Sequence, residues 1–247
     1  MTRTFAPSVA VRAVSRDIRA QEDSRRPAAS PTNVVLIGPP GAGKGTQATR
    51  LARWLSVPTI STGDMLRRAV QSGSAIGLAV KAVLERGELI EDATMTEIVA
   101  ARLAEADTEA GFVLDGFPRN VDQAVALDSL LEQRGDLIAV ELAVPEGAII
   151  RRLGQRRVCE RCGRNADPLS GTPPKVCPCG GAFRQRSDDT ETVIRERLRT
   201  YDRATKPLID FYRQRHSLRA IDGTLAPDLV AAQISQIIDA VFDHAAS

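Results

Sequence analysis

The sequence has no apolar stretch long enough to span a membrane. Nowhere in the 247 residues does an apolar run approach the ~20 residues that a transmembrane helix needs. The N-terminal region also lacks the apolar segment of a secretory signal. We therefore expect a soluble cytoplasmic protein with no membrane partner. In that compartment the four cysteines are expected to be thiols or metal ligands rather than disulfides.

The two signs of charge nearly cancel, and lysine is scarce. With 33 basic and 31 acidic residues, the net charge of +2 argues against the concentrated positive field that nucleic-acid or membrane-surface binding requires. Lysine occurs only at positions 44, 81, 175 and 206, so arginine supplies most of the positive charge. Arginine is the better two-pronged phosphate ligand. Codon bias gives the same excess of arginine, so the positions of the arginines must decide whether they bind phosphate.

The first 32 residues differ from the rest of the chain. They contain six arginines and three acids with little apolar periodicity, whereas the whole sequence is 43% hydrophobic. We expect residues 1–32 to be a disordered N-terminal extension and residues 33–247 to form the folded domain. An organelle transit peptide and a misassigned start codon are the alternatives for this segment.

A phosphate-binding loop is the clearest motif of the folded region. Residues 33–37 read as a buried strand, residues 38–45 contain four glycines and Lys44, and a helical pattern follows. In such a unit the glycines let backbone N–H groups point at a phosphate, and the helix N-terminus adds partial positive charge. One departure from the general pattern is that Gly45, rather than Ser or Thr, follows the lysine, with Thr46 next.

Strands and helices alternate from residue 33 onward. The predicted strands, apolar on both faces, are Val34–Ile37, Pro58–Ser61, Phe112–Asp115, Ile138–Ala143 and Leu218–Asp222. The predicted helices are Lys44–Leu55, Asp64–Gln71, Ile76–Arg86, Thr94–Ala106, Val121–Gln133, Glu146–Leu153, Glu191–Arg215 and Asp228–His244. This pattern predicts an α/β fold of three layers around a doubly wound, five-stranded parallel sheet. Ligands of such sheets bind at the carboxyl ends of the strands.

Two segments interrupt the alternation and are predicted to be inserts at that edge of the sheet. Residues 61–90 hold two successive helices with no strand between them, and residues 155–187 carry all four cysteines but little apolar periodicity. The core is then expected to comprise residues 33–60, 91–154 and 188–247.

Asp115 is the candidate for holding Mg²⁺. It ends an apolar strand, at the edge of the sheet where the phosphate loop is also expected. A carboxylate in that position holds the Mg²⁺ that accompanies a bound nucleotide. An ordinary strand-end aspartate in a turn is the alternative, since Gly116 and Pro118 follow.

Three motifs in order carry a resemblance to a known family. They are residues 38–46 (Gly-Pro-Pro-Gly-Ala-Gly-Lys-Gly-Thr), 61–67 (Ser-Thr-Gly-Asp-Met-Leu-Arg) and 115–119 (Asp-Gly-Phe-Pro-Arg). Over about residues 33–245 the chain resembles the adenylate kinases, which belong to the nucleoside-monophosphate kinases. The glycine after Lys44 is that family's version of the loop. The resemblance implies reversible phosphoryl transfer from MgATP to AMP, giving two ADP, by an enzyme that is often monomeric.

The resemblance also implies two nucleotide sites. The ATP site would comprise Gly41, Ala42, Gly43, Lys44, Gly45, Thr46, Arg152, Arg156 and Leu225. The AMP site would comprise Thr62, Arg67, Glu88, Leu89, Ile90, Gly116, Phe117, Pro118, Arg119, Gln123, Arg186 and Arg197. The catalytic residues would be Lys44, Arg119, Arg156, Arg186 and Arg197. Any one of these arginines alone reads as a solvated surface residue, and Arg152 is harder to assign because Arg151 is adjacent.

This set of residues suits phosphoryl transfer. A loose transition state spreads charge over the equatorial oxygens, so catalysis consists mostly of positioning and electrostatic stabilisation. The attacking AMP phosphate is already anionic, so no general base is needed. The only histidines, His216 and His244, are accordingly expected on the surface of the last helices. Residues 155–187 are expected to form a lid that closes over ATP and excludes water.

The four cysteines of the lid form two close pairs. Cys159 and Cys162 are spaced Cys-x-x-Cys, whereas Cys177 and Cys179 are spaced Cys-Pro-Cys. The pattern predicts a structural zinc site with four thiolate ligands, and the metal would supply folding energy to a segment without an apolar core. Zinc-bearing lids occur in the family, but with a longer second pair. Free or redox-active thiols are the alternative.

Three other functions remain open at this stage. A CMP or UMP kinase is the nearest, although pyrimidine-preferring relatives usually have Ala in the position of Thr62, and Gln123 also argues against it. A guanine-nucleotide switch needs Asn-Lys-x-Asp, and no lysine of this chain follows an asparagine. A non-catalytic nucleotide- and zinc-binding protein is disfavoured by the intact Lys44 and the complete arginine set.

Overall fold

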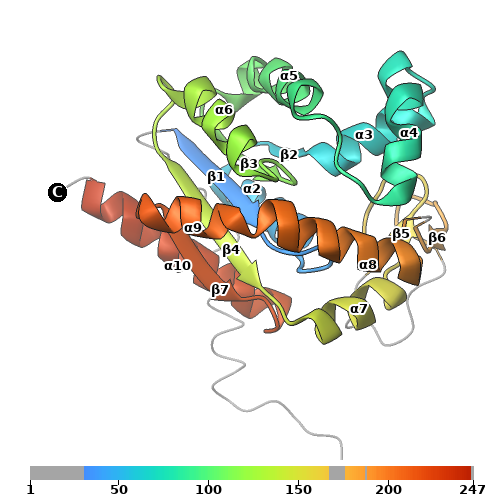
Figure 1. Cartoon of the computed structure of the whole chain (residues 1–247). Helices are drawn as coiled ribbons and strands as arrows, with labels where there is room; N and C mark the ends of the chain where they lie inside the picture. The colour runs from blue at the N-terminus through green and yellow to red at the C-terminus, as the bar shows by residue number, and fades with distance from the viewer. Residues whose placement is uncertain (1–30, 167–175, 187, 246–247) are drawn as a thin grey trace, which may run out of the picture.

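The computed structural model describes residues 31–166, 176–186 and 188–245, so nearly all of the predicted extension and part of the predicted lid lie outside it. Five parallel strands form one sheet in the order β2-β3-β1-β4-β7, which confirms the predicted sheet (Figure 1). The strands are β1 Thr32–Ile37, β2 Thr59–Ser61, β3 Gly111–Asp115, β4 Leu137–Ala143 and β7 Leu218–Asp222. Each lies within two residues of its predicted bounds.

Helices cover both faces of the sheet, as predicted. Along β1, Val34 and Leu36 pack on one face, and Val35 and Ile37 pack on the other. On the first face lie α2 (Lys44–Leu55) and α10 (Pro227–Ala245). On the second lie α5 (Asp92–Leu103), α6 (Val121–Leu131) and α9 (Pro207–Gln214). Because both faces are buried, the strands are apolar throughout rather than alternating.

One predicted helix, Glu191–Arg215, is wrong as a continuous element. The structure divides it into α8 (Glu191–Thr200), a wide π-type turn (Tyr201–Thr205) and α9. Pro207 has no N–H to continue the ladder of hydrogen bonds. The preceding N–H, that of Lys206, donates to the carbonyl of Tyr201 at 2.9 Å, five residues back. A smaller difference concerns the predicted helix Thr94–Ala106. The structure has α5 over Asp92–Leu103, followed by a short 3₁₀ turn, η1 (Ala106–Thr108).

The two segments that interrupt the alternation lie on the same side of the molecule in Figure 1. Residues 61–90 contain α3 (Thr62–Gln71) and α4 (Ala75–Arg86). After α7 (Glu146–Gln155), a small antiparallel sheet pairs β5 (Val158–Cys159) with β6 (Phe183–Arg184). Of the two histidines, His216 is exposed as expected, and the side chain of His244 lies outside the described part. None of the helices in the described ranges is both long and apolar enough to cross a bilayer.

Gly111→Ala should destabilise the fold. Gly111 begins β3 with φ +117°, and a Cβ there would lie 2.2 Å from the backbone oxygen of Thr32 in the neighbouring strand. Backbone strain and the clash should together lower the free energy of unfolding by about 3 kcal/mol, as measured by urea denaturation. Gly154→Ala is the control, because no atom lies within 4 Å of the added Cβ in α7. If the two variants lowered the free energy of unfolding equally, the requirement for glycine at position 111 would be contradicted.

Candidate active site

The phosphate loop runs from β1 into α2 and packs tightly against its surroundings. Gly41 has φ +82°, and a Cβ on it would lie 2.8 Å from Cγ of the buried Leu153. Lys44, the first residue of α2, donates from Nζ to the carbonyl oxygens of Gly38 at 2.7 Å and Pro39 at 2.9 Å. The loop thus holds its lysine against its own backbone, at the carboxyl end of β1.

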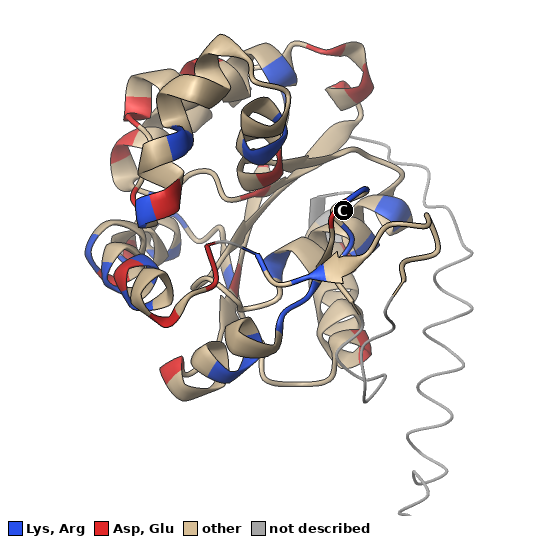
Figure 2. Cartoon of the chain, turned by 90° about the vertical axis from the view of Figure 1, so that its right-hand side faces the viewer, with Lys and Arg blue, Asp and Glu red and all other residues tan. Residues whose placement is uncertain are grey.

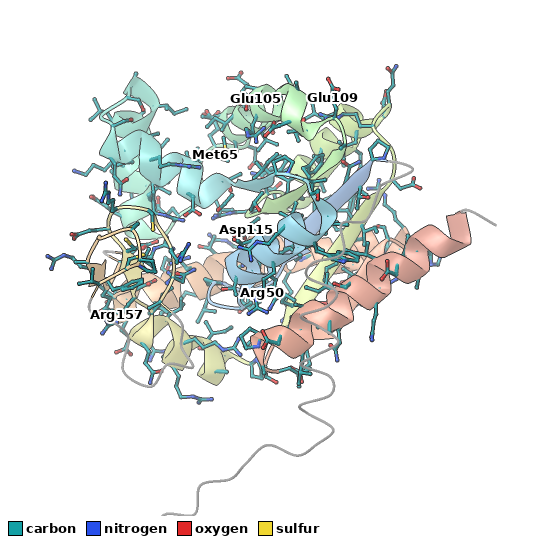
Figure 3. All side chains as sticks on the ribbon, turned by 180° about the vertical axis from the view of Figure 1, so that it is seen from behind. Arg50, Met65, Glu105, Glu109, Asp115 and Arg157 are labelled. Carbon is teal, nitrogen blue, oxygen red and sulfur yellow. The ribbon has the colours of Figure 1, made fainter. Side chains whose placement is uncertain are left out.

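The glycine after Lys44 has a spatial explanation. A Cβ at Gly45 would lie 3.3 Å from Oδ2 of Asp115, which ends the adjacent strand β3. In Figure 3, Asp115 is labelled beside α2, with Met65 of α3 above it and Arg157 below it. The carboxylate therefore faces the loop closely, where a larger side chain would displace it. Carboxylate oxygens are the ligands that Mg²⁺ prefers, so Asp115 fits the metal role expected of it.

Lys44 shares its surroundings with three arginines from different elements. Loss of water around the ammonium lowers the pKa of Lys44 to about 8, although Asp115 opposes the shift. The positive charges of Arg119, Arg197 and Arg156 lower it further. These side chains come from α2, the loop after β3, α8 and the end of α7. Cations so arranged repel one another and favour a ligand with several negative charges.

Two neighbouring aspartates hold three of the arginines. Asp189, whose side chain is fully buried, accepts two hydrogen bonds from Arg156, one of them from Nε at 2.6 Å. Asp188 accepts from Nε and Nη2 of Arg186, both at 2.9 Å. Arg197 lies between them, with Nη1 at 3.3 Å from Asp188 and 3.4 Å from Asp189.

The electrostatics of this group reflect crowding. Burial lowers the pKa of Arg197 to about 10, and the charges of Arg156 and Arg186 act in the same direction against the two aspartates. Burial also opposes ionisation of Asp188, but Arg186 and Arg197 outweigh it and hold the pKa of that carboxyl below its ordinary value. Figure 2 shows basic positions on several elements around the middle of this face of the molecule.

A second group of predicted residues meets at the end of β3. Thr62 Oγ1 donates to the carbonyl of Gly116 at 2.9 Å, and Arg119 Nε donates to the same carbonyl at 2.8 Å. The backbone N–H of Arg119 donates to Oε1 of Gln123 at 2.8 Å. The predicted AMP residues Thr62, Gly116, Arg119 and Gln123 are thus joined by hydrogen bonds.

Arg67 connects this group to the other arginines. It pairs with Asp64 one helical turn earlier in α3. Loss of water lowers the pKa of Arg67, and the charge of Arg186 lowers it further.

Phe117 and Pro118 are buried and joined by a cis peptide bond.

The stretch Glu88-Leu89-Ile90 divides between surface and core. Glu88 is exposed and accepts two hydrogen bonds from Arg86, at 2.9 and 2.8 Å. Leu89 is half-buried, and Ile90 belongs to the apolar core. The polar side chain of this stretch is therefore paired locally.

Arg152 lies beside the phosphate loop. Its guanidinium is 3.5 Å from the carbonyl oxygens of both Ala42 and Thr224. It borders a hollow of about 630 Å³. Thr224, which also lines the hollow, directly precedes the half-buried Leu225. The lining residues are Pro145, Gly147, Ala148, Arg151, Arg152, Gln155 and Thr224.

Comparison with known proteins shows the family of this chain. Residues 36–217 match the family model for adenylate kinase. The chain is 42% identical over 214 residues to an adenylate kinase of Archaeoglobus fulgidus, which covers 85% of this chain and 99% of the relative. Adenylate kinases of Thermosipho africanus and Desulfitobacterium hafniense are 44% and 45% identical, over 83% and 85% of this chain and 99% and 97% of their own lengths.

The chain belongs to the adenylate kinase family. The match spans both segments that interrupt the alternation of strands and helices, as well as the phosphate loop. Among the predicted arginines, the structure brings Arg119, Arg156 and Arg197 together around Lys44. Sequence reasoning missed Asp92 and Asn120, which bond to Gln123 and to each other. Asn120 carries a local signal, as the N-cap of α6 three residues before Gln123. No local pattern marks Asp92, because it lies in α5, 31 residues from Gln123.

The four cysteines of this adenylate kinase family member gather in one cluster. Their Sγ atoms all lie within 4.8 Å of one another, with 3.4 Å between Cys159 and Cys179 and 3.6 Å between Cys162 and Cys177. These separations exceed a disulfide bond of about 2 Å. Burial disfavours ionisation of Cys159, but hydrogen bonds from the N–H groups of Cys162 and Arg161 and from the thiol of Cys179 outweigh it and lower the pKa of Cys159, while the pKa of Cys179 rises in return. The close approach of the four sulfur atoms allows the cluster to hold a metal ion.

Affinity for MgATP should fall as the pH rises above 8. Lys44, with a pKa of about 8, is charged below that value and neutral above it. Bound phosphates favour the charged form, so binding between about pH 8 and 10 should take up a proton. Calorimetry from pH 7.5 to 9.5, in two buffers of different ionisation enthalpy, measures both effects. Lys44→Met should bind weakly and without this pH dependence, whereas constant wild-type affinity across the range would contradict the assignment.

Proposed function

We propose that this chain catalyses reversible transfer of the terminal phosphoryl group of MgATP to AMP, giving two ADP, with the residue roles described below. The observation that carries the roles is the convergence of Lys44, Arg119, Arg156 and Arg197 from four elements at the carboxyl edge of the sheet. A transferring phosphoryl group flanked by two nucleotides presents the dispersed negative charge that such a set stabilises.

In this proposal the ATP phosphates bind the loop 41–46 at the N-terminus of α2, where backbone N–H groups and Lys44 face them. Arg152 and Leu225 contact the adenosine beside the hollow at α7. Mg²⁺, held with its water shell by Asp115, would supply charge neutralisation and orientation of the ATP phosphates.

The acceptor binds between α3 and the loop after β3. Arg67 and Arg119 hold the AMP phosphate, while Thr62, Gln123 and the backbone of residues 88–90 contact its base. The transferring phosphoryl group is stabilised by Arg156, Arg186 and Arg197. Because a phosphate oxygen of AMP attacks, the reaction needs no proton removed, and the absence of histidine from this set fits a mechanism of positioning and charge.

Residues 61–90 and 155–187 are proposed to act as the acceptor-binding insert and the lid. Asp188 and Asp189, directly after the lid, hold arginines that the phosphates also require. Competition between carboxylate and phosphate for the same guanidinium groups gives a physical link between nucleotide binding and movement of the lid.

We also propose that the cysteine cluster binds structural zinc. Tetrahedral zinc with Zn–S bonds of about 2.3 Å separates its sulfur ligands by about 3.8 Å, within the range seen here. Four protein ligands leave no position for substrate, so the metal stabilises the lid rather than the reaction.

Transfer from MgATP should be fastest to AMP among the common nucleoside monophosphates. The measurement is a coupled assay with AMP, CMP, UMP and GMP as acceptors under identical conditions. The hydrogen-bonded group of Thr62, Gly116 and Gln123 at the proposed base site is the reason for expecting discrimination. Faster transfer to a pyrimidine monophosphate would overturn the substrate assignment.

Protein purified without added zinc should contain about one equivalent of the metal. Cys162→Ser should lower that content at least several-fold and reduce the melting temperature, because it removes one of four ligands. Arg164→Ser, an exposed position in the same segment, is the control and should retain zinc. Elemental analysis gives the metal content. Less than about a tenth of an equivalent in the wild type, with four titratable thiols, would exclude the zinc site.

A further inference from the structure

The side-chain amide of Gln123 is held at both of its polar atoms. Nε2 donates to Oδ1 of Asp92 at 2.7 Å, and Oε1 accepts from the backbone N–H of Arg119 at 2.8 Å. The residue is only 2% exposed, and its own backbone N–H donates to Asn120 Oδ1 at 2.8 Å. Both the position and the orientation of the amide are therefore determined by neighbours.

These two partners permit only one orientation of the amide. A carboxylate only accepts hydrogen bonds, and a backbone N–H only donates. Rotating the Gln123 amide by a half turn would bring oxygen against Asp92 and NH₂ against the N–H of Arg119. Asn120 Nδ2 donates to both oxygens of Asp92, at 2.9 and 2.8 Å, and so fixes the carboxylate itself.

The fixed amide retains hydrogen-bonding capacity for a ligand. Its NH₂ group has two hydrogens, of which Asp92 takes one, and its oxygen has two lone pairs, of which Arg119 takes one. One donor and one acceptor remain, in a fixed order.

That order matters because purine bases differ in it. Adenine presents an amino donor at position 6 beside an acceptor at N1, whereas guanine and hypoxanthine present a carbonyl acceptor at position 6 beside an N1–H donor. An amide can pair with either edge, but only by turning over between them. An amide that cannot turn over recognises one edge and rejects the other.

We propose that Asp92 is a positioning residue that makes the acceptor site select adenine over 6-oxopurines by fixing the amide of Gln123. The inference rests on the proposed function, in which Gln123 contacts the acceptor base. Asp92 is the first residue of α5, two residues after the end of the segment 61–90, whereas Gln123 lies in the first turn of α6. The selection thus depends on a contact between two helices rather than on the base-contacting residue alone.

The test compares AMP and IMP as acceptors with MgATP, because IMP reverses the donor and acceptor at positions 6 and 1 without adding a group. Asp92→Asn and Asp92→Ser can each donate as well as accept, so both remove one of the two constraints on the amide. Turning over then costs only the bond from the N–H of Arg119. The preference for AMP, expressed as the ratio of kcat/KM values, should narrow about ten-fold in each, the equivalent of one hydrogen bond. The loss for AMP should lie more in KM than in kcat.

Two further variants separate this role from a general structural one. Asp92→Glu keeps a group that only accepts and should retain the AMP preference even if stability falls. Asp107→Asn removes an exposed carboxylate, paired with Arg102, by the same chemical change and should leave the preference unaltered. Melting temperatures of all variants show which of them fold. If only one of Asp92→Asn and Asp92→Ser folds, that one is sufficient for the comparison.

The outcomes are distinct. If Asp92→Asn or Asp92→Ser lowers kcat/KM for AMP and IMP by the same factor, the inference is wrong and Asp92 only supports the fold. Equal loss of preference in Asp92→Glu and Asp92→Asn also contradicts it. Wild-type protein that fails to use AMP would instead contradict the proposed function, before any variant is considered.

Discussion

Crowding of positive charge at one edge of the sheet is the constraint on which the rest of this structure depends. Each cation loses water there and repels the others, which lowers the pKa of Lys44 to about 8 and that of Arg197 to about 10. Carboxylates offset part of this cost: Asp115 does so at Lys44, and Asp188 and the fully buried Asp189 do so at Arg197. The site therefore gains more from a polyanionic ligand than any single exposed arginine could, because removal of water strengthens each interaction.

The same constraint explains why the site draws on so many elements. A single helix could not bring these side chains together without placing like charges on adjacent turns, which destabilises a helix. Distribution among α2, α7, α8 and the loop after β3 lets rigid, well-packed elements bear the repulsion. Across the wide turn before Pro207, α8 and α9 follow one another end to end (Figure 1), with Arg197 of α8 at the site and Leu208 and Tyr212 of α9 in the core.

Elements marked by a local sequence pattern could be predicted, whereas contacts between residues far apart in the sequence could not. The phosphate loop and all five strands followed from glycine spacing and short apolar runs. The division of Glu191–Arg215 was signalled by Pro207, but the apolar spacing of the two flanking helices concealed it. The contact between Asp92 and Gln123 joins residues 31 apart and leaves no periodic trace. The reason for glycine at position 45 likewise became visible only when β3 brought Asp115 beside it.

Charge and hydrogen-bond direction divide the work of this site. Phosphates are common to every nucleotide, so the lysine and arginines can supply affinity and rate but cannot distinguish one base from another. Discrimination must come from groups whose hydrogen bonds have a fixed direction, and buried bonds are the most selective because an unmatched partner loses water without compensation. The hydrogen bonds differ accordingly: Gln123 bonds to Asp92 and Thr62 bonds to the carbonyl of Gly116, near the end of β3. Arg156, Arg186 and Arg197 bond to Asp188 and Asp189 instead. A substitution at Asp92, which bonds to Asn120 and Gln123, can therefore alter selectivity while the arginines held by Asp188 and Asp189 stay in place.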